Sequence, residues 1–94
     1  MTTFNSLVNI KAARTACRRF EATFKGQGPR YFQDVQILVV WHRDSYKCIN
    51  CGSDHRLTVD HIKPWYLGGE TRIKNAQTLC KPCNWDKFKE DGSK

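Results

Sequence analysis

The sequence has no long hydrophobic run and few acidic residues. No apolar stretch approaches the ~20 residues that a membrane-spanning helix needs, and polar residues stand where a signal peptide has its apolar region. These absences argue against a membrane partner and favour a cytoplasmic protein, in which thiols stay reduced. Lys and Arg number 16 against 9 Asp and Glu, a formal net charge of +7. That excess suits a polyanionic partner, with nucleic acid as the first candidate, and charge alone leaves a merely soluble basic surface equally open.

The chain is also short, and its 94 residues make one domain. A core of that size is marginal, so a structural metal ion would supply a large part of the stability.

Cysteine, in contrast, is plentiful and patterned. Four of the five cysteines form two C-x-x-C pairs, Cys48 with Cys51 and Cys80 with Cys83. Two such knuckles complete a tetrahedral four-cysteine zinc site, and four cysteine ligands leave no position open for chemistry, so we expect a structural Zn²⁺. The alternative is two disulfides in a secreted protein, which the missing signal peptide argues against. Cys17 has no partner nearby and is expected in the core.

The N-terminal half is expected to be helical. Apolar residues recur at helical spacing over residues 1–25, with Asn5 or Ser6 as a plausible N-cap. The basic flank of this helix is either a solvated face or a phosphate contact; it comprises Lys11, Arg14, Arg18 and Arg19. After a break at residues 26–29, a second helix is predicted over about residues 31–43. Its apolar run at residues 37–40 is also compatible with a buried strand, and we prefer helix for its length.

The C-terminal half predicts a hairpin followed by a helix. Residues 56–62 alternate apolar and polar, as a strand does. A long loop over residues 63–74, with Pro64 and a Gly68-Gly69 turn, precedes a short antiparallel strand at residues 75–79. Residues 84–90 are expected to form a short helix and residues 91–94 a frayed tail. The expected fold class is therefore a small α+β fold.

Several motifs of this half occur in a specific order. They are Asp60-His61-Ile62-Lys63-Pro64, Gly68-Gly69, Asn75, and Leu79-Cys80-x-x-Cys83-Asn84-x-x-Lys87. Over about residues 44–88 this pattern closely resembles the HNH endonuclease family in its zinc-stabilised form. The resemblance implies a ββα-metal (His-Me finger) unit, in which two strands and a helix grip one divalent ion. It implies one HNH nuclease domain over residues 1–94, with residues 1–47 as helical support and residues 48–90 as the zinc knuckles and catalytic unit.

The resemblance also implies the role of each motif residue. His61 matches the general base, and a neutral imidazole can take a proton from water near pH 7. Asp60 matches a ligand of the catalytic metal, for which carboxylate oxygen suits Mg²⁺ or Mn²⁺. Asn75 matches the residue that holds the long loop, and its amide can donate to and accept from the loop backbone. Asn84 stands where the family usually has a histidine ligand, which makes this an HNN variant.

Metal preference and DNA contacts follow from these assignments. A carbonyl ligand at Asn84 should favour softer metals less than an imidazole would. This substitution leaves the preferred catalytic metal open among Mg²⁺, Mn²⁺ and Ni²⁺. The expected DNA contacts are Lys87, Arg72, Lys63 and Lys74. Consecutive strand residues point to opposite faces, so Asp60 and His61 reach one site only if the strand end is distorted.

Some residues carry two interpretations. Trp65, Tyr66 and Trp85 can stack on bases or pack in a small core. The pair Asp54-His55 repeats the motif but lacks the loop that follows it, and we interpret it as a turn.

The predicted function is a divalent-metal-dependent endonuclease that nicks or cleaves DNA with little sequence preference. The alternatives are a non-catalytic zinc module that binds nucleic acid and a zinc-stabilised protein-interaction domain. The set Asp60, His61, Asn75 and Asn84 favours the enzyme, because a binding module needs neither a base nor an open metal site. The resemblance includes bacteriophage packaging proteins and bacterial nucleases, so a phage origin with packaging proteins as partners is one expectation.

Overall fold

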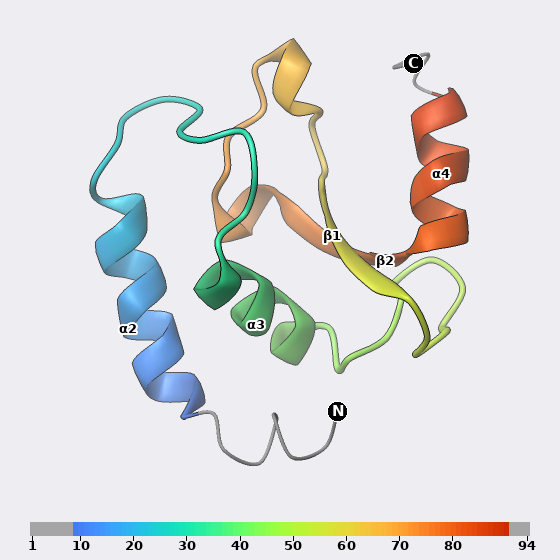
Figure 1. Cartoon of the computed structure of the whole chain (residues 1–94), viewed down its shortest axis with the longest axis horizontal. Coiled ribbons are helices and arrows are strands. Elements are labelled where there is room, and N and C mark those ends of the chain that lie inside the picture. The colour runs from blue at the N-terminus through green and yellow to red at the C-terminus, as the bar shows by residue number, and fades with distance from the viewer. Residues whose placement is uncertain (1–8, 91–94) are drawn as a thin grey trace.

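The computed structural model describes residues 9–90, which form a small α+β fold (Figure 1). Two helices come first, α2 (Ile10–Glu21) and α3 (Asp34–Arg43). A hairpin of β1 (Leu57–His61) and β2 (Ala76–Cys80) follows, and α4 (Lys81–Glu90) continues directly from it. The loop of the hairpin contains two 3-10 turns, η1 (Trp65–Leu67) and η2 (Ile73–Asn75). The expected fold class is confirmed.

Helix α2 is shorter than predicted at its C-terminal end. It stops at Glu21 rather than near residue 25, and the Thr23 hydroxyl donates to the Phe20 carbonyl at 2.6 Å just beyond it. Asn9 caps the other end, where its side chain accepts from the Ala12 amide at 3.2 Å. The cap predicted at Asn5 or Ser6 lies outside the described residues. The buried face is formed by Ala13 and Cys17.

Helix α3 confirms the helical interpretation of the second apolar segment. It begins at Asp34, three residues later than predicted, and the Gln33 amide donates to the Gln36 side chain at 2.9 Å at its start. Val39 packs with Ala13 and Cys17 of α2 in one hydrophobic cluster. A second cluster lies under the hairpin and consists of Cys48, Leu79 and Cys80. Cys48 and Cys80, which belong to the two C-x-x-C pairs, are therefore core residues as well.

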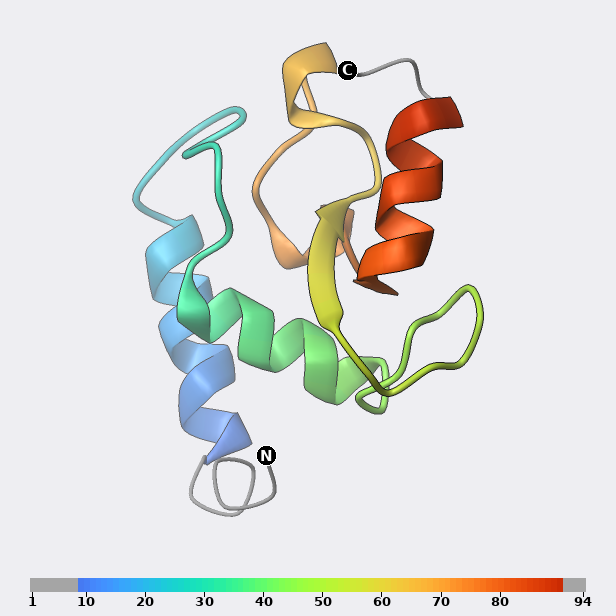
Figure 2. The ribbon, with the colours of Figure 1, turned by 45° about the vertical axis from the view of Figure 1, so that its right-hand side comes forward.

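The two strands are antiparallel, with Leu57 opposite Cys80 and His61 opposite Ala76. Strand β2 runs one residue later than predicted, and four of its five residues are buried. Helix α4 begins at Lys81 rather than Asn84. Figure 2 shows α3 and α4 on opposite sides of the hairpin. None of the helices in residues 9–90 is long and apolar enough to cross a membrane.

Candidate active site and metal centre

The four cysteines of the C-x-x-C pairs converge at the open end of the hairpin. Their sulfur atoms all lie within 4.8 Å of one another. Thiolates around a tetrahedral zinc ion at ~2.3 Å would be ~3.8 Å apart, and the sulfurs of Cys51 and Cys80 are 3.6 Å apart. That separation is too long for a disulfide bond. The cluster is compatible with a structural zinc ion, as predicted.

Hydrogen bonds prepare one thiol of the cluster for ionisation. Burial would raise the pKa of Cys48, but backbone amides of Cys80, Cys51 and Asn50 donate to its sulfur and bring its pKa to about 6. The Asn50 side chain donates to Cys83 at 3.2 Å, yet the neighbouring thiols raise the pKa of Cys83 to about 12. Further negative sulfurs need a balancing cation, which a metal ion supplies.

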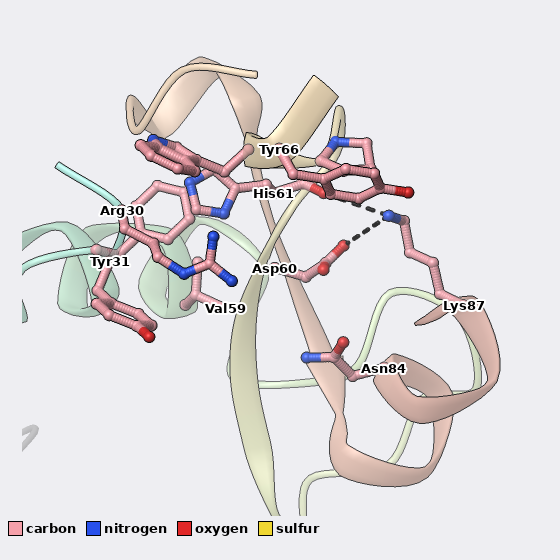
Figure 3. Close-up of a pocket in the computed structure, with 11 residues that line it drawn as sticks. Arg30, Tyr31, Val59, Asp60, His61, Tyr66, Asn84 and Lys87 are labelled. Atoms are coloured by element: carbon pink, nitrogen blue, oxygen red, sulfur yellow. Dashed lines mark hydrogen bonds and ion pairs between the residues drawn. The ribbon is translucent and has the colours of Figure 1, made fainter. Parts of the chain in front are cut away.

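A second site lies along β1. An open pocket of about 250 Å³ brings together Asp60, His61, Asn84 and Lys87 (Figure 3). The sheet formed by residues 9–90 has two strands, so one edge of β1 is unpaired. In Figure 3 the strand runs between His61 on one side and Asp60 on the other. The two side chains leave opposite faces, and the pocket spans the edge between them. The strand is regular through His61, and that both side chains reach one catalytic site stays a prediction.

The imidazole of His61 is held from two sides. Its Nε2 lies 2.9 Å from the Thr71 hydroxyl, and its ring lies 4.3 Å from the Phe32 ring with the two planes 31° apart. Burial lowers the pKa of His61 below its ordinary value; Asp60 acts in the opposite direction, and Arg30 and Lys87 add to the lowering. The ring is therefore neutral at pH 7 and can accept a proton.

Asp60 and Asn84 present oxygen atoms to the other half of the pocket. The Asp60 carboxylate accepts from Gln77 at 2.9 Å and pairs with the Lys87 ammonium at 3.4 Å. Asn84 donates its amide N–H to the Thr58 hydroxyl at 3.0 Å. This bond fixes the amide, and its carbonyl oxygen turns toward the Asp60 carboxylate (Figure 3). Carboxylate and carbonyl oxygens are ligands for hard divalent cations, so the donor set fits such an ion.

Asn75 lies outside the pocket, at the end of the long loop. Its Nδ2 donates to the carbonyls of Lys63 and Glu70 at 3.2 and 2.9 Å, and its Oδ1 accepts from the Lys63 amide at 3.0 Å. The loop is tight as well, since a Cβ at Gly69 would clash with the Lys63 carbonyl. These contacts are the ones expected of Asn75, whose part in catalysis stays a prediction.

The predicted DNA-binding residues fall into three settings. Lys87 lies in the pocket. Lys63 and Lys74 border a separate hollow of the loop with Asn75. The Arg72 guanidinium is used within the protein: it donates to the carbonyls of Glu21 and Phe24 and to the Glu70 carboxylate, at 2.8 to 2.9 Å. Arg72 thus ties the loop to the end of α2, and its DNA contact stays a prediction.

Sequence reasoning missed the contribution of residues 29–32 and of Thr71. Arg30 lines the pocket, and its guanidinium lies 5.3 Å from the Trp65 ring, a cation–π contact. Phe32 packs on the proposed base and Thr71 bonds to it. No periodic spacing in the sequence marks these residues. The available signal was that Arg30 and Phe32 closely follow the Gly28-Pro29 turn.

The aromatic residues and the second Asp-His pair have distinct positions. Trp65 donates to the Gly28 carbonyl at 3.4 Å, which joins the loop to the N-terminal half. Tyr66 and Trp85 are more than half exposed. His55 pairs with Asp54 at 2.5 Å and its side chain is 85% exposed, as expected of a surface turn.

Comparison with known proteins gives a family assignment for the second half of the chain. Residues 48–90 match the family model described as HNH endonuclease. No curated protein and no solved structure gives a significant match. The matched segment contains all four cysteines of the cluster, the hairpin with its loop, and α4.

Proposed function

Because residues 48–90 belong to the HNH endonuclease family, we propose that this protein is a divalent-metal-dependent endonuclease that nicks or cleaves DNA with little sequence preference. The family implies a nuclease acting on nucleic acid. The observation that supports the finer proposal is the single pocket that His61 lines from one side of β1 and that Asp60 and Asn84 line from the other. The net charge of +7 supports a polyanionic substrate.

Asp60 and Asn84 would hold the catalytic cation. The Lys87 ammonium pairs with the Asp60 carboxylate at 3.4 Å, and a divalent cation would take its place beside that carboxylate. A divalent cation bound there would act as a Lewis acid that stabilises negative charge on the scissile phosphate and on the leaving oxygen.

His61 would act as the general base. Its neutral imidazole takes a proton from a water molecule as the water oxygen attacks phosphorus and the bond to the 3′ oxygen breaks. The products are a 5′-phosphate and a 3′-hydroxyl. Arg30 and Lys87 flank this position with positive charge, and we assign them to the phosphate groups. Asn75 would keep the loop, and with it the end of β1, in place.

The test is a nicking assay on supercoiled plasmid with Mg²⁺, Mn²⁺ or Ni²⁺, each with and without EDTA. We expect metal-dependent nicking by the wild type and its loss in His61→Ala, with zinc content and melting temperature unchanged. His55→Ala is the matched control, because that histidine is 85% exposed and belongs to the surface turn. Retained cleavage by His61→Ala would remove His61 from the role of base. Binding of plasmid without nicking under any ion would favour the non-catalytic zinc module instead.

The biological setting predicted from the sequence, a phage or bacterial cytoplasm with packaging proteins as partners, stays a prediction.

A further inference from the structure

Thr71 is the polar residue most closely joined to the proposed base, and no motif includes it. It is fully buried and lies in the loop just before η2. Its hydroxyl donates to the Pro29 carbonyl and lies 2.9 Å from His61 Nε2. A hydroxyl has one hydrogen. Because that hydrogen points to Pro29, the hydroxyl can only accept from the imidazole, so His61 Nε2 carries a proton.

This chain of hydrogen bonds has a chemical consequence. A neutral imidazole protonated on Nε2 has its lone pair on Nδ1. In Figure 3 the ring lies beside the Arg30 guanidinium, on the side of β1 opposite the Asp60 carboxylate. We propose that Thr71 is a positioning residue that fixes His61 in its Nε2–H tautomer and so presents Nδ1 to the attacking water. The functional part of this inference rests on the proposed role of His61 as base.

The N-terminal half of the chain holds Thr71 in place. The Thr71 amide donates to the Gln27 carbonyl at 2.8 Å, and its own carbonyl accepts from the fully buried Gln36 side chain at 2.9 Å. With Pro29, these residues fix the backbone and the hydroxyl of Thr71 from the loop after α2 and from α3. Phe32 covers the imidazole face from the same direction. The loop after α2 and helix α3 thus set the tautomer of a residue in the hairpin.

The first test reads the tautomer directly and does not depend on activity. Long-range ¹H–¹⁵N spectra of the zinc-loaded protein, recorded at alkaline pH, distinguish a protonated from an unprotonated ring nitrogen for each of its 3 histidines. The His61 signals are assigned by their loss in His61→Ala. We expect Nε2–H in the wild type and in Thr71→Ser, and a mixture of tautomers in Thr71→Val, which has the same shape but no hydroxyl. An Nδ1–H tautomer in the wild type, or an unchanged spectrum in Thr71→Val, would overturn the proposal.

The second test connects the tautomer to catalysis. In the plasmid assay we expect Thr71→Val to lower kcat by about tenfold to a hundredfold, as loss of a positioning partner typically does, while its Kd for DNA measured with EDTA stays unchanged. Thr71→Ser should recover most of the rate. A variant that only loosened the fold would lower the melting temperature and weaken DNA binding too.

The two proposals fail separately. If His61→Ala is inactive and Thr71→Val nicks at the wild-type rate, the positioning role is wrong and the nuclease assignment stands. If His61→Ala nicks as well as the wild type, the role of base is wrong, and the spectra still decide whether Thr71 sets the tautomer.

Discussion

Asn84 is the residue at which this chain departs most clearly from the motif that it resembles. Its amide nitrogen is committed to the Thr58 hydroxyl, and Thr58 in turn donates to the Leu79 carbonyl at 2.7 Å. These two hydrogen bonds to the hairpin thus orient the carbonyl oxygen of Asn84. A hard oxygen ligand here should favour Mg²⁺ and Mn²⁺, whereas an imidazole at the same position would favour Ni²⁺.

Asn84→His should therefore raise the nicking rate with Ni²⁺ relative to that with Mg²⁺. Asn84→Ala removes the ligand and should lower activity by about tenfold to a hundredfold with every ion. The measurement is the initial nicking rate at a series of metal concentrations, with Asn50→Ala as the control, since that asparagine contacts the cysteine cluster and not the pocket. Identical metal preference in the wild type and Asn84→His would show that Asn84 is not a ligand.

The resemblance pointed to Asp60, His61 and Asn84, and the structure brings these three residues to one pocket; their catalytic roles stay predictions. Thr71, Arg30 and Phe32 could not be predicted, because they reach the site across contacts between distant segments, which leave no periodic signal. Arg72 shows what positive charge alone does not reveal: its guanidinium donates to the carbonyls of Glu21 and Phe24, and its predicted DNA contact stays a prediction.

Among the elements, the end of α3 is joined to β2 by hydrogen bonds of two adjacent residues, Arg43 to the Ala76 carbonyl and Asp44 to the Thr78 amide. Asp44 accepts from the Thr78 amide at 3.0 Å and forms a two-pronged ion pair with Arg43 at 2.8 and 2.9 Å. Its side chain is 11% exposed. Burial alone would raise the pKa of Asp44, but the bonds from Arg43 and Thr78 outweigh it and lower the pKa below its ordinary value of 3.8.

Because the folded pKa is lowered, ionised Asp44 adds stability above pH 3.8, and this contribution disappears as pH falls through the lower, folded value. Asp44→Ala should cost about 2 kcal/mol at neutral pH, the range for hydrogen bonds to a charged group. The difference in free energy of unfolding between the wild type and Asp44→Ala should shrink below pH 3.8. Urea unfolding across pH measures it, with Asp54→Ala as the control, since the Asp54 side chain is 64% exposed. A difference independent of pH would contradict the ion-pair account.

Element types were predicted more reliably than their ends. The alternation over residues 56–62 and the length of the apolar segment before it identified a strand and a helix. The ends moved where tertiary contacts decided them: α4 begins at Lys81 because β2 runs straight into it, and α2 stops at Glu21, whose carboxylate accepts from the Gln36 side chain and the Ile73 amide at 3.0 and 2.8 Å. Local helix propensity does not predict such contacts between α2, α3 and the loop, so it does not predict where the helices end.

In the molecule as a whole, two small hydrophobic clusters together form the core of the described residues. One joins α2 and α3; the other is built from Cys48, Leu79 and Cys80, with Leu57 and Cys83 packed against it. Three of these five residues are cysteines of the C-x-x-C pairs, so without a metal ion this cluster would pack ionisable thiols against one another. The hairpin and α4 depend on the cysteine cluster for the packing that α2 and α3 obtain from apolar side chains.

Loss of zinc should therefore unfold the protein. Binding of structural zinc contributes an apparent ~10–16 kcal/mol, which matches or exceeds the ~5–15 kcal/mol of a typical folded domain. Cys80→Ser should contain no zinc and show no cooperative melting transition. Cys17→Ala is the matched control: that cysteine is fully buried between α2 and α3, where burial and Glu21 raise its thiol pKa to about 11. The control should bind one zinc per chain and melt only slightly lower. Zinc content and circular dichroism melting curves decide the matter; a zinc-free Cys80→Ser that melts like the wild type would show that the hairpin is held by packing alone.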